Sequence, residues 1–207
     1  MYISKQTLDK IRKFLSESLS KHRYTHTLGV EETAAKLGEV FLPDKLSEIR
    51  AAALLHDVSK EYSAAEHLEL LKNNENITSD DYDTEAAYHA FSAPEVIKRK
   101  FPECATDDIL SAAFKHTTGD CDMSLFDKII FISDYIEPGR TYYQCTILRE
   151  KLLSDLVSAK DAGERLNCLD SAVLTALDNT IRAISERGGV LNKRTLLAKK
   201  KISKSTL

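Results

Sequence analysis

The stretch AAALLHDVSK, residues 51–60, is apolar for five residues and then reaches the ionisable pair His56-Asp57. An unpaired buried charge is expensive, so such groups are usually paired or bound to a metal. The preceding residues Ile49 and Ala53 share a helical face with His56, which predicts a helix that enters the core. We therefore expect a partner in the core that neutralises Asp57.

The rest of the chain has the same helical periodicity. Its 207 residues are enough for one sizeable core, and it contains only 7 Gly and 4 Pro. No segment alternates convincingly as a strand would, and we find no internal repeat. The fold class predicted is an all-α bundle. The expected helices include residues 8–19, 30–41 and 46–56, and others lie near 63–72, 84–100, 106–116, 123–137, 142–160 and 165–187.

Two parts are predicted along the chain: a single domain over residues 1–190 and a basic C-terminal tail over residues 191–207. Gly188-Gly189 is typical of a helix C-terminus. The tail carries only basic charges, which can contact nucleic acid or a membrane. We expect instead a frayed, solvated end and no stable nucleic-acid partner.

Composition excludes several classes of protein. The net charge of -3 is typical of neither an acidic tail protein nor a nucleic-acid binder. No apolar run approaches the length of a membrane span, and the N-terminus MYISKQTLDK has no signal-peptide core. The four cysteines are far apart and form no CxxC pair, which favours reduced thiols. We expect a cytoplasmic protein without a membrane partner.

Ionisable side chains fall on the apolar faces of five predicted helices. Bundle cores commonly hold metals between facing helices, and imidazole with carboxylate suits Fe, Mn or Zn. Six ligands exceed one tetrahedral site, whereas two metals that share Asp57 as a bridge would use them all. Two metals roughly 3.5–4 Å apart can activate a bridging water for phosphoryl displacement. The predicted ligands are His26, His56, Asp57, His89, His116 and Asp134.

The order of these ligands resembles that of the HD-domain metal phosphohydrolases. Four segments are similar to the YqeK subfamily: HRYTHTLGV (22–30), ALLHDVSK (53–60), KHTTGD (115–120) and MSLFDKIIFISDYIEPGR (123–140). The resemblance covers roughly residues 1–190 and implies an all-α HD fold with a di-iron-type centre. It implies symmetrical hydrolysis of dinucleoside tetraphosphates, chiefly diadenosine tetraphosphate to two ADP. A metal-bridging hydroxide would attack a central phosphorus.

The resemblance assigns the ligands residue by residue. His26, His56, Asp57 and Asp134 match the ligands of the first metal. Asp57 also matches the bridge, with His89 and His116 on the second metal. The expected ions are two divalent metals, Fe first, with Mn, Co or Zn as alternatives. The segment YHAFSAPEV (88–96) keeps His89 but departs from the subfamily, with Ala90 in place of a glycine and Pro94 further along.

Cations and hydroxyls near the ligands are candidates for binding phosphate, since phosphoryl transfer needs mainly positioning and charge neutralisation. Lys60 lies one helical turn beyond His56 and could reach a phosphate; with Asp57 it is our candidate catalytic residue. Arg140 follows the turn Glu137-Pro138-Gly139. The further candidates are Arg23, Thr117 and Thr118. Each has a plainer alternative: a surface charge for the cations, and helix termination before Gly119 for the threonines.

Three alternatives stay open. The same HD site could act on another nucleotide: a monophosphate, a cyclic dinucleotide or guanosine tetraphosphate. The chain could be a sensing module with a degenerate HD fold, although such modules usually lose ligands and here all six positions are filled. A metal-free bundle with paired core histidines predicts no metal after purification. The sequence also leaves open whether the protein forms a homodimer.

Overall fold

The computed structural model describes residues 2–72 and 74–204, and within these ranges the regular structure is helical, with no strand. The all-α prediction is confirmed. Short 3₁₀ turns occupy Pro43–Lys45, Ser79–Asp81, Glu85–Ala87 and Pro102–Cys104. The α-helices are α1 (Lys5–Ser18), α2 (Lys21–Phe41), α3 (Leu46–Leu55), α4 (Ala64–Leu71), α5 (Tyr88–Lys100), α6 (Asp107–Lys115), α7 (Leu125–Ile136), α8 (Tyr143–Ser158), α9 (Ala162–Glu186) and α10 (Lys193–Ile202).

Local sequence sets most of the helix starts. Side-chain oxygens of Ser4, Ser20, Ser63, Thr106 and Ser124 accept hydrogen bonds from the first turns of α1, α2, α4, α6 and α7. The helix predicted over residues 84–100 begins only at Tyr88, because residues 85–87 form a 3₁₀ turn instead. This later start places His89 in the first turn of α5.

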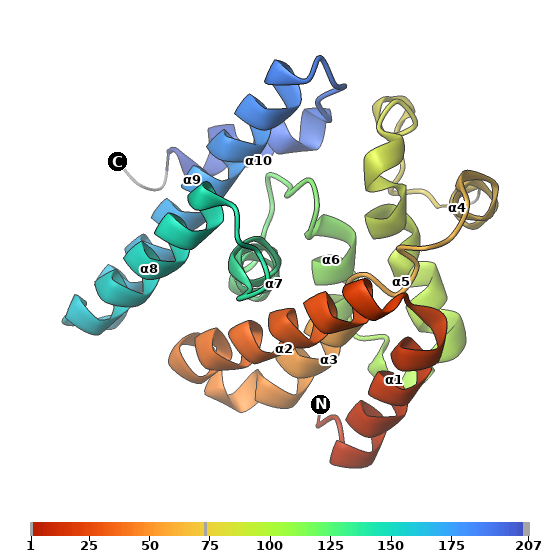
Figure 1. Ribbon diagram of the computed structural model, residues 1–207, viewed down its shortest axis with the longest axis horizontal. Helices are drawn as coiled ribbons and strands as arrows, with labels where there is room; N and C mark the ends of the chain where they lie inside the picture. The colour runs from red at the N-terminus through yellow and green to blue at the C-terminus, as the bar shows by residue number, and fades with distance from the viewer. Residues whose placement is uncertain (1, 73, 205–207) are drawn as a thin grey trace.

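The helices pack around α3 and α7. Helix α3 contacts α1, α2, α6 and α7, and α7 also contacts α8 and α9. In Figure 1, α8 to α10 lie on one side of α7, and α4 and α5 lie on the other. The run Ala51–Leu55 is fully buried because α3 is enclosed by its neighbours. Burial of each leucine there contributes about 1.5–3 kcal/mol, which explains an apolar run without a polar face.

A second, smaller core lies between α4, α5 and α6. It consists of Leu71, Ala87, Tyr88, Phe91 and Phe114. The rings of Phe91 and Phe114 have centroids 5.1 Å apart. Since Phe91 belongs to α5 and Phe114 to α6, this cluster fixes the two helices against each other.

The C-terminal segment differs from its prediction. Residues 193–202 form α10, which packs on α9 and buries Thr195, Ala198 and Ile202. The expected frayed and solvated end is therefore wrong for these residues, because their small and apolar side chains recur at helical spacing among the lysines. Residues 205–207 lie outside the described residues. The division at residue 190 stays a prediction. No described helix combines the length and the apolar character needed to cross a membrane.

Candidate metal centre

The structure brings all six predicted ligands together at the middle of the bundle. Helix α2 carries His26, α5 carries His89 and α7 carries Asp134. His56 and Asp57 follow the last turn of α3, and His116 follows the last turn of α6. The four histidines and Asp57 are buried, and Asp134 is partly buried. The apolar helices α3, α6 and α7 thus deliver polar groups to one point.

The carboxylate of Asp57 separates the four histidines into two pairs. Its Oδ2 lies 3.5 Å from His56 Nε2 and 3.9 Å from His26 Nε2. Its Oδ1 lies 3.4 Å from His89 Nε2 and 3.4 Å from His116 Nε2. Each oxygen therefore faces its own pair, which is the arrangement that a bridging carboxylate between two cations requires.

Asp134 completes the group around Oδ2 of Asp57. Its Oδ1 lies 2.9 Å from His26 Nε2 and 4.0 Å from His56 Nε2. His26, His56 and Asp134 each offer one donor atom, and these atoms lie within 4.8 Å of one another; the same is true of His56, Asp57 and His116. The two donor sets therefore overlap at His56, with one carboxylate in each.

Backbone carbonyls fix the protonation of two histidine rings. The Nδ1 of His56 lies 2.6 Å from the carbonyl oxygen of Ala53, and the Nδ1 of His116 lies 2.7 Å from that of Ala113. A carbonyl oxygen can only accept, so each Nδ1 carries the hydrogen. The Nε2 lone pairs of His56 and His116 are then free to bind a metal, the arrangement usual for metal-binding histidines.

Unpaired atoms indicate that this donor set fits a cation. Within the described residues, the buried atoms His56 Nε2 and Asp57 Oδ1 have no hydrogen-bond partner. A buried lone pair that faces a carboxylate is costly unless a positive charge lies between them. Nitrogen and carboxylate donors that converge in this way match the ligand preferences of Fe, Mn and Zn.

The pKa shifts of Asp57, His89 and His116 favour the form that binds a metal, whereas that of His56 does not: burial lowers the pKa of His56, but Asp57 and Asp134 outweigh burial and raise it above its usual value. Burial raises the pKa of the Asp57 carboxyl, but His56, His116 and Lys60 outweigh it and hold that pKa well below its usual range. Burial lowers the pKa of His116 and lowers the pKa of His89 strongly. Asp57 is therefore an anion, and His89 and His116 are neutral imidazoles that can act as ligands.

Two arginines bind the carboxylates of the site from outside. Nη1 of Arg23 lies 2.9 Å from Asp57 Oδ2. Nη2 of Arg140 lies 2.7 Å from Asp134 Oδ1, and its Nε donates to the Asp134 carbonyl oxygen. Both guanidinium groups are about a quarter to a third exposed, so each spans the space between the buried ligands and solvent.

Lys60 lies at the second histidine pair. Its Nζ is 2.8 Å from His89 Nε2 and 3.9 Å from Asp57 Oδ1. Burial lowers the pKa of Lys60, and Asp57 opposes this shift. One lone pair on His89 Nε2 cannot accept a hydrogen bond from Lys60 and bind a metal at once. A metal at His89 therefore requires Lys60 to find another partner.

The two threonines of the HTTG segment have different surroundings. Thr117 Oγ1 lies 3.0 Å from His89 Nε2. Thr118 is buried, and its hydroxyl donates to the carbonyl oxygen of Gly119. Gly119 has φ 64°, the left-handed conformation that ends α6. The structure thus brings Thr117 to the site but not Thr118.

Sequence reasoning missed one residue that touches a ligand. The buried Glu137 places its Oε1 3.1 Å from His26 Nδ1, and its Oε2 accepts from the backbone N–H of Gly139. A carboxylate on Nδ1 orients the ring and leaves Nε2 to face the metal. The signal in the sequence is the acid that opens the turn Glu137-Pro138-Gly139, directly before Arg140.

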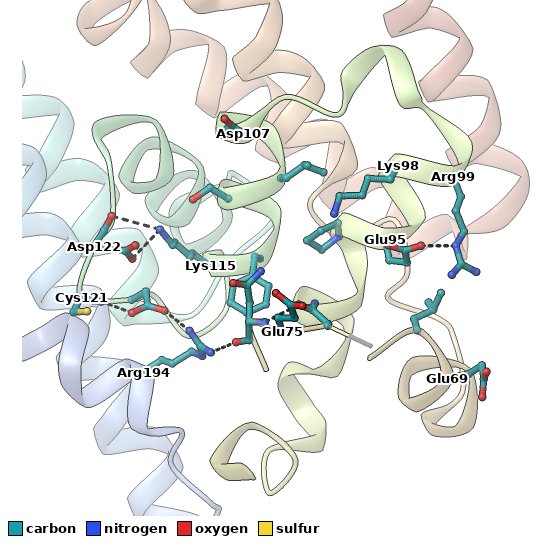
Figure 2. A pocket seen from close by; sticks show the side chains of 18 residues that line it. Glu69, Glu75, Glu95, Lys98, Arg99, Asp107, Lys115, Cys121, Asp122 and Arg194 are labelled. Carbon is teal, nitrogen blue, oxygen red and sulfur yellow. Dashed lines mark hydrogen bonds and ion pairs between the residues drawn. The ribbon is translucent and has the colours of Figure 1, made fainter. Parts of the chain in front are cut away.

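Two cavities flank α5. A cavity of about 320 Å³ adjoins the site and is lined by Lys60, Tyr62, Ala64, His67, Glu85, Ala86 and His89. A larger one of about 860 Å³ lies among α4, α5, α6 and the start of α10, and none of the six predicted ligands lines it (Figure 2). The smaller cavity is therefore the one placed to receive a molecule that reacts at the histidine cluster.

The HD domain family matches residues 23–139, a range that contains all six predicted ligands. The chain belongs to the HD domain family. Membership implies a divalent metal, and the His and Asp clusters described above supply suitable donors. The chain is accordingly a hydrolase of the HD type.

The YqeK-type resemblance predicted from the sequence is also confirmed. A "Bis(5'-nucleosyl)-tetraphosphatase, symmetrical" of Halalkalibacterium halodurans is 30% identical over 190 residues, which are 90% of this chain and 92% of the relative. Proteins of the same name are 34% identical in Bacillus subtilis, over 70% of this chain and 77% of the relative, and 33% identical in Staphylococcus aureus, over 65% and 68%.

A solved structure supports the same fold. The crystal structure of a "predicted HD superfamily hydrolase involved in NAD metabolism" from Clostridium acetobutylicum superimposes with a TM-score of 0.81 at 30% identity. The match covers 99% of this chain and 100% of that one. The similarity therefore extends through α10, beyond the range of the HD domain match.

Proposed function

We propose that this protein hydrolyses diadenosine tetraphosphate symmetrically to two ADP. The observation that carries the proposal is the position of Asp57, whose two carboxylate oxygens face two separate histidine pairs. Such an arrangement suits two cations, and two-cation sites are typical of phosphoryl displacement. The relatives named as symmetrical tetraphosphatases supply the substrate.

The proposed metal ligands are those expected from the sequence. His26, His56 and Asp134 would hold one ion, His89 and His116 would hold the other, and Asp57 would be shared. When bound, two divalent cations would activate a water for attack and neutralise the charge that develops on phosphate. Iron is the metal we propose first, because imidazole and carboxylate donors suit it, with Mn, Co or Zn as alternatives.

The chain's own residues would bind and orient the tetraphosphate. Lys60 changes partner from His89 to a phosphate oxygen, which keeps a positive charge near the reacting phosphorus. Arg23 and Arg140 hold the carboxylates of Asp57 and Asp134 and present their exposed N–H groups to the phosphate chain. Thr117 supplies a hydroxyl 3.0 Å from His89 Nε2. ADP is a good leaving group, so no general acid is required.

The cavity of about 320 Å³ beside His89 and Lys60 supports an approach of the substrate from that side. We place the reaction in the cytoplasm, because all four cysteines are free thiols and the substrate is an intracellular nucleotide.

The test is a product assay. Anaerobically purified protein, with its metals counted, is incubated with diadenosine tetraphosphate, and the nucleotides are separated. ADP as the sole product is the expected result. AMP with ATP would contradict symmetrical cleavage. Full metal content without turnover would contradict the assignment of diadenosine tetraphosphate as the substrate. Nucleotide monophosphates, cyclic dinucleotides and guanosine tetraphosphate would then be assayed.

A further inference from the structure

Arg194, in the first turn of α10, joins three segments that are distant in sequence. Its Nε and Nη2 bind the two carboxylate oxygens of Asp81, each at 2.9 Å. Its Nη1 binds Asp120 Oδ2 at 2.5 Å, and Nη2 also donates to the carbonyl oxygen of Asn76. Figure 2 shows this guanidinium on the wall of the larger cavity, near Cys121. Nearly all its donors are therefore used by the protein itself.

The same guanidinium covers the smaller core. Its central carbon lies 5.0 Å from the ring centroid of Phe114 and 5.9 Å from that of Phe91. A cation over two aromatic faces is attracted to both. Only 18% of the Arg194 side chain is exposed, so this attraction acts in a mostly dry setting.

Three of the groups that Arg194 touches lie within four residues of the second histidine pair: Phe91, Phe114 and Asp120. Phe91 lies two positions after His89 on α5, and Phe114 lies two positions before His116 at the end of α6. Asp120 ends the HTTGD segment that begins at His116.

The segment before α5 is held by α10 as well. Asn192, the N-cap of α10, donates from Nδ2 to Asp81 Oδ1 and to Thr84 Oγ1, both at 3.2 Å. Thr84 in turn precedes the 3₁₀ turn that leads into α5. Residues of α10 therefore hold both the segment before His89 and the segment after His116. The contacts of Arg194 named above do not include α2 or α3, from which the first pair comes.

We propose that Arg194 is a positioning residue for the second metal: it sets the separation of His89 and His116 and thereby the affinity of that pair for a cation. The inference rests on the proposed dinuclear centre but not on the proposed substrate. Groups hydrogen-bonded to metal ligands typically change metal affinity 10–100-fold when removed, and Arg194 acts on the ligands one contact further away, so we expect the lower end of that range. The charge that Arg194 carries is already neutralised by Asp81 and Asp120, so we assign it no contact with the substrate.

The experiment compares Arg194→Gln and Arg194→Lys with the control Lys199→Gln, which removes the exposed pair of α10 with Asp178. Each metal-free protein is titrated with Mn²⁺ alone, and electron paramagnetic resonance follows the signal of coupled ions. The wild type and the control should bind two ions. Arg194→Gln should bind the second ion at least about tenfold more weakly, with the first unchanged.

Arg194→Lys keeps the charge but loses the bidentate contact with Asp81, so it should fold and show the same selective loss of affinity for the second ion. Two tightly bound, coupled ions in both variants, or an equal loss at both sites, would overturn the proposal. So would a wild type that binds one ion. A wild type that binds two ions but leaves diadenosine tetraphosphate intact would remove the proposed substrate and leave the positioning role standing.

Discussion

Gly29 of α2 and Glu137 after α7 are in such close contact that a Cβ atom at Gly29 would lie 2.4 Å from Glu137 Oε2. Side chains with a Cβ do not tolerate that distance, so glycine at this position allows the carboxylate to reach His26 Nδ1. Backbone carbonyls around the same turn are held by Arg149, which donates to those of Ile136, Glu137 and Arg140. The backbone of the turn at residues 136–140 is therefore held in place beside Gly29.

Gly29→Ala should displace Glu137 from His26 and weaken the first metal about tenfold, the usual scale for a lost ligand-orienting contact. Stability without metal should change little, because helix propensity favours alanine by about 1 kcal/mol. Metal titration and thermal unfolding measure the two effects separately. Gly163→Ala, in the first turn of α9, is the control. Unchanged metal affinity in Gly29→Ala would show that Glu137 does not orient His26.

Asp57→Ala should abolish activity, by at least about 10²-fold, and lower the metal content, because it removes the anion that two cations would share. Metal analysis and the product assay on the same preparation check both outcomes. Asp155→Ala, which removes a partly exposed aspartate of α8 that pairs with Lys151, should leave both unchanged. Full turnover in Asp57→Ala would refute the bridging role.

Lys60→Ala should raise the KM or slow turnover about tenfold, the equivalent of one lost charge-assisted hydrogen bond. Metal content should stay the same or rise slightly, because Lys60 no longer competes with the metal for the lone pair of His89 Nε2. Steady-state kinetics and metal counting distinguish the two effects. Lys10→Ala, whose ammonium pairs with Glu103 on the surface, is the control. A change in metal binding alone would exclude the phosphate role.

Acid should release α10 through Asp81. Burial raises the pKa of this carboxyl, but hydrogen bonds from Arg194, Thr78 and Asn192 outweigh burial and depress the pKa below its ordinary 3.8. A depressed pKa contributes stability that is present above pH 3.8 and is lost as the pH falls through the folded-state value. Wild type should therefore exceed Arg194→Gln in Tm near pH 7, and the difference should shrink below about pH 4.

Thermal unfolding of both proteins between pH 7 and pH 3 measures this difference. A lost pair of this kind should lower Tm by a few degrees at neutral pH, given about 2–4 °C per kcal/mol for a chain of this length. A Tm difference that stays constant down to pH 3 would mean that Asp81 does not stabilise the folded protein through its charge.

The helical period was sufficient to predict that His26, His56, His89, His116 and Asp134 point into the core, because each shares a face with apolar residues of its own helix, and the structure brings these side chains together. The period alone predicts only the helix face on which a residue lies. The resemblance to the HD family assigned each of these residues to one of the two metals. Both the all-α fold and the family are confirmed. The metal and substrate roles of the individual residues stay predictions, as does a homodimer.

What the sequence did not indicate depends on contacts between distant residues. Arg194 and Asp81 are 113 positions apart, and Glu137 and His26 are 111 apart. In one sequence, a basic residue in a run of lysines looks the same whether it is solvated or paired with a buried carboxylate. The acid of a Pro-Gly turn likewise gives no sign of the histidine it will meet. Propensity and spacing are local, and these partners are not.

The order of the chain also has a consequence for synthesis on the ribosome. The segments around Asp81 and Asp120 are translated before Arg194, so they emerge while the guanidinium that joins them does not yet exist. Until α10 follows, these carboxylates lack the guanidinium that pairs with both, and the small aromatic core lacks its cover. The nascent chain can thus form the half of the bundle around α2 and α3 early, but it completes the half around α5 and α6 last.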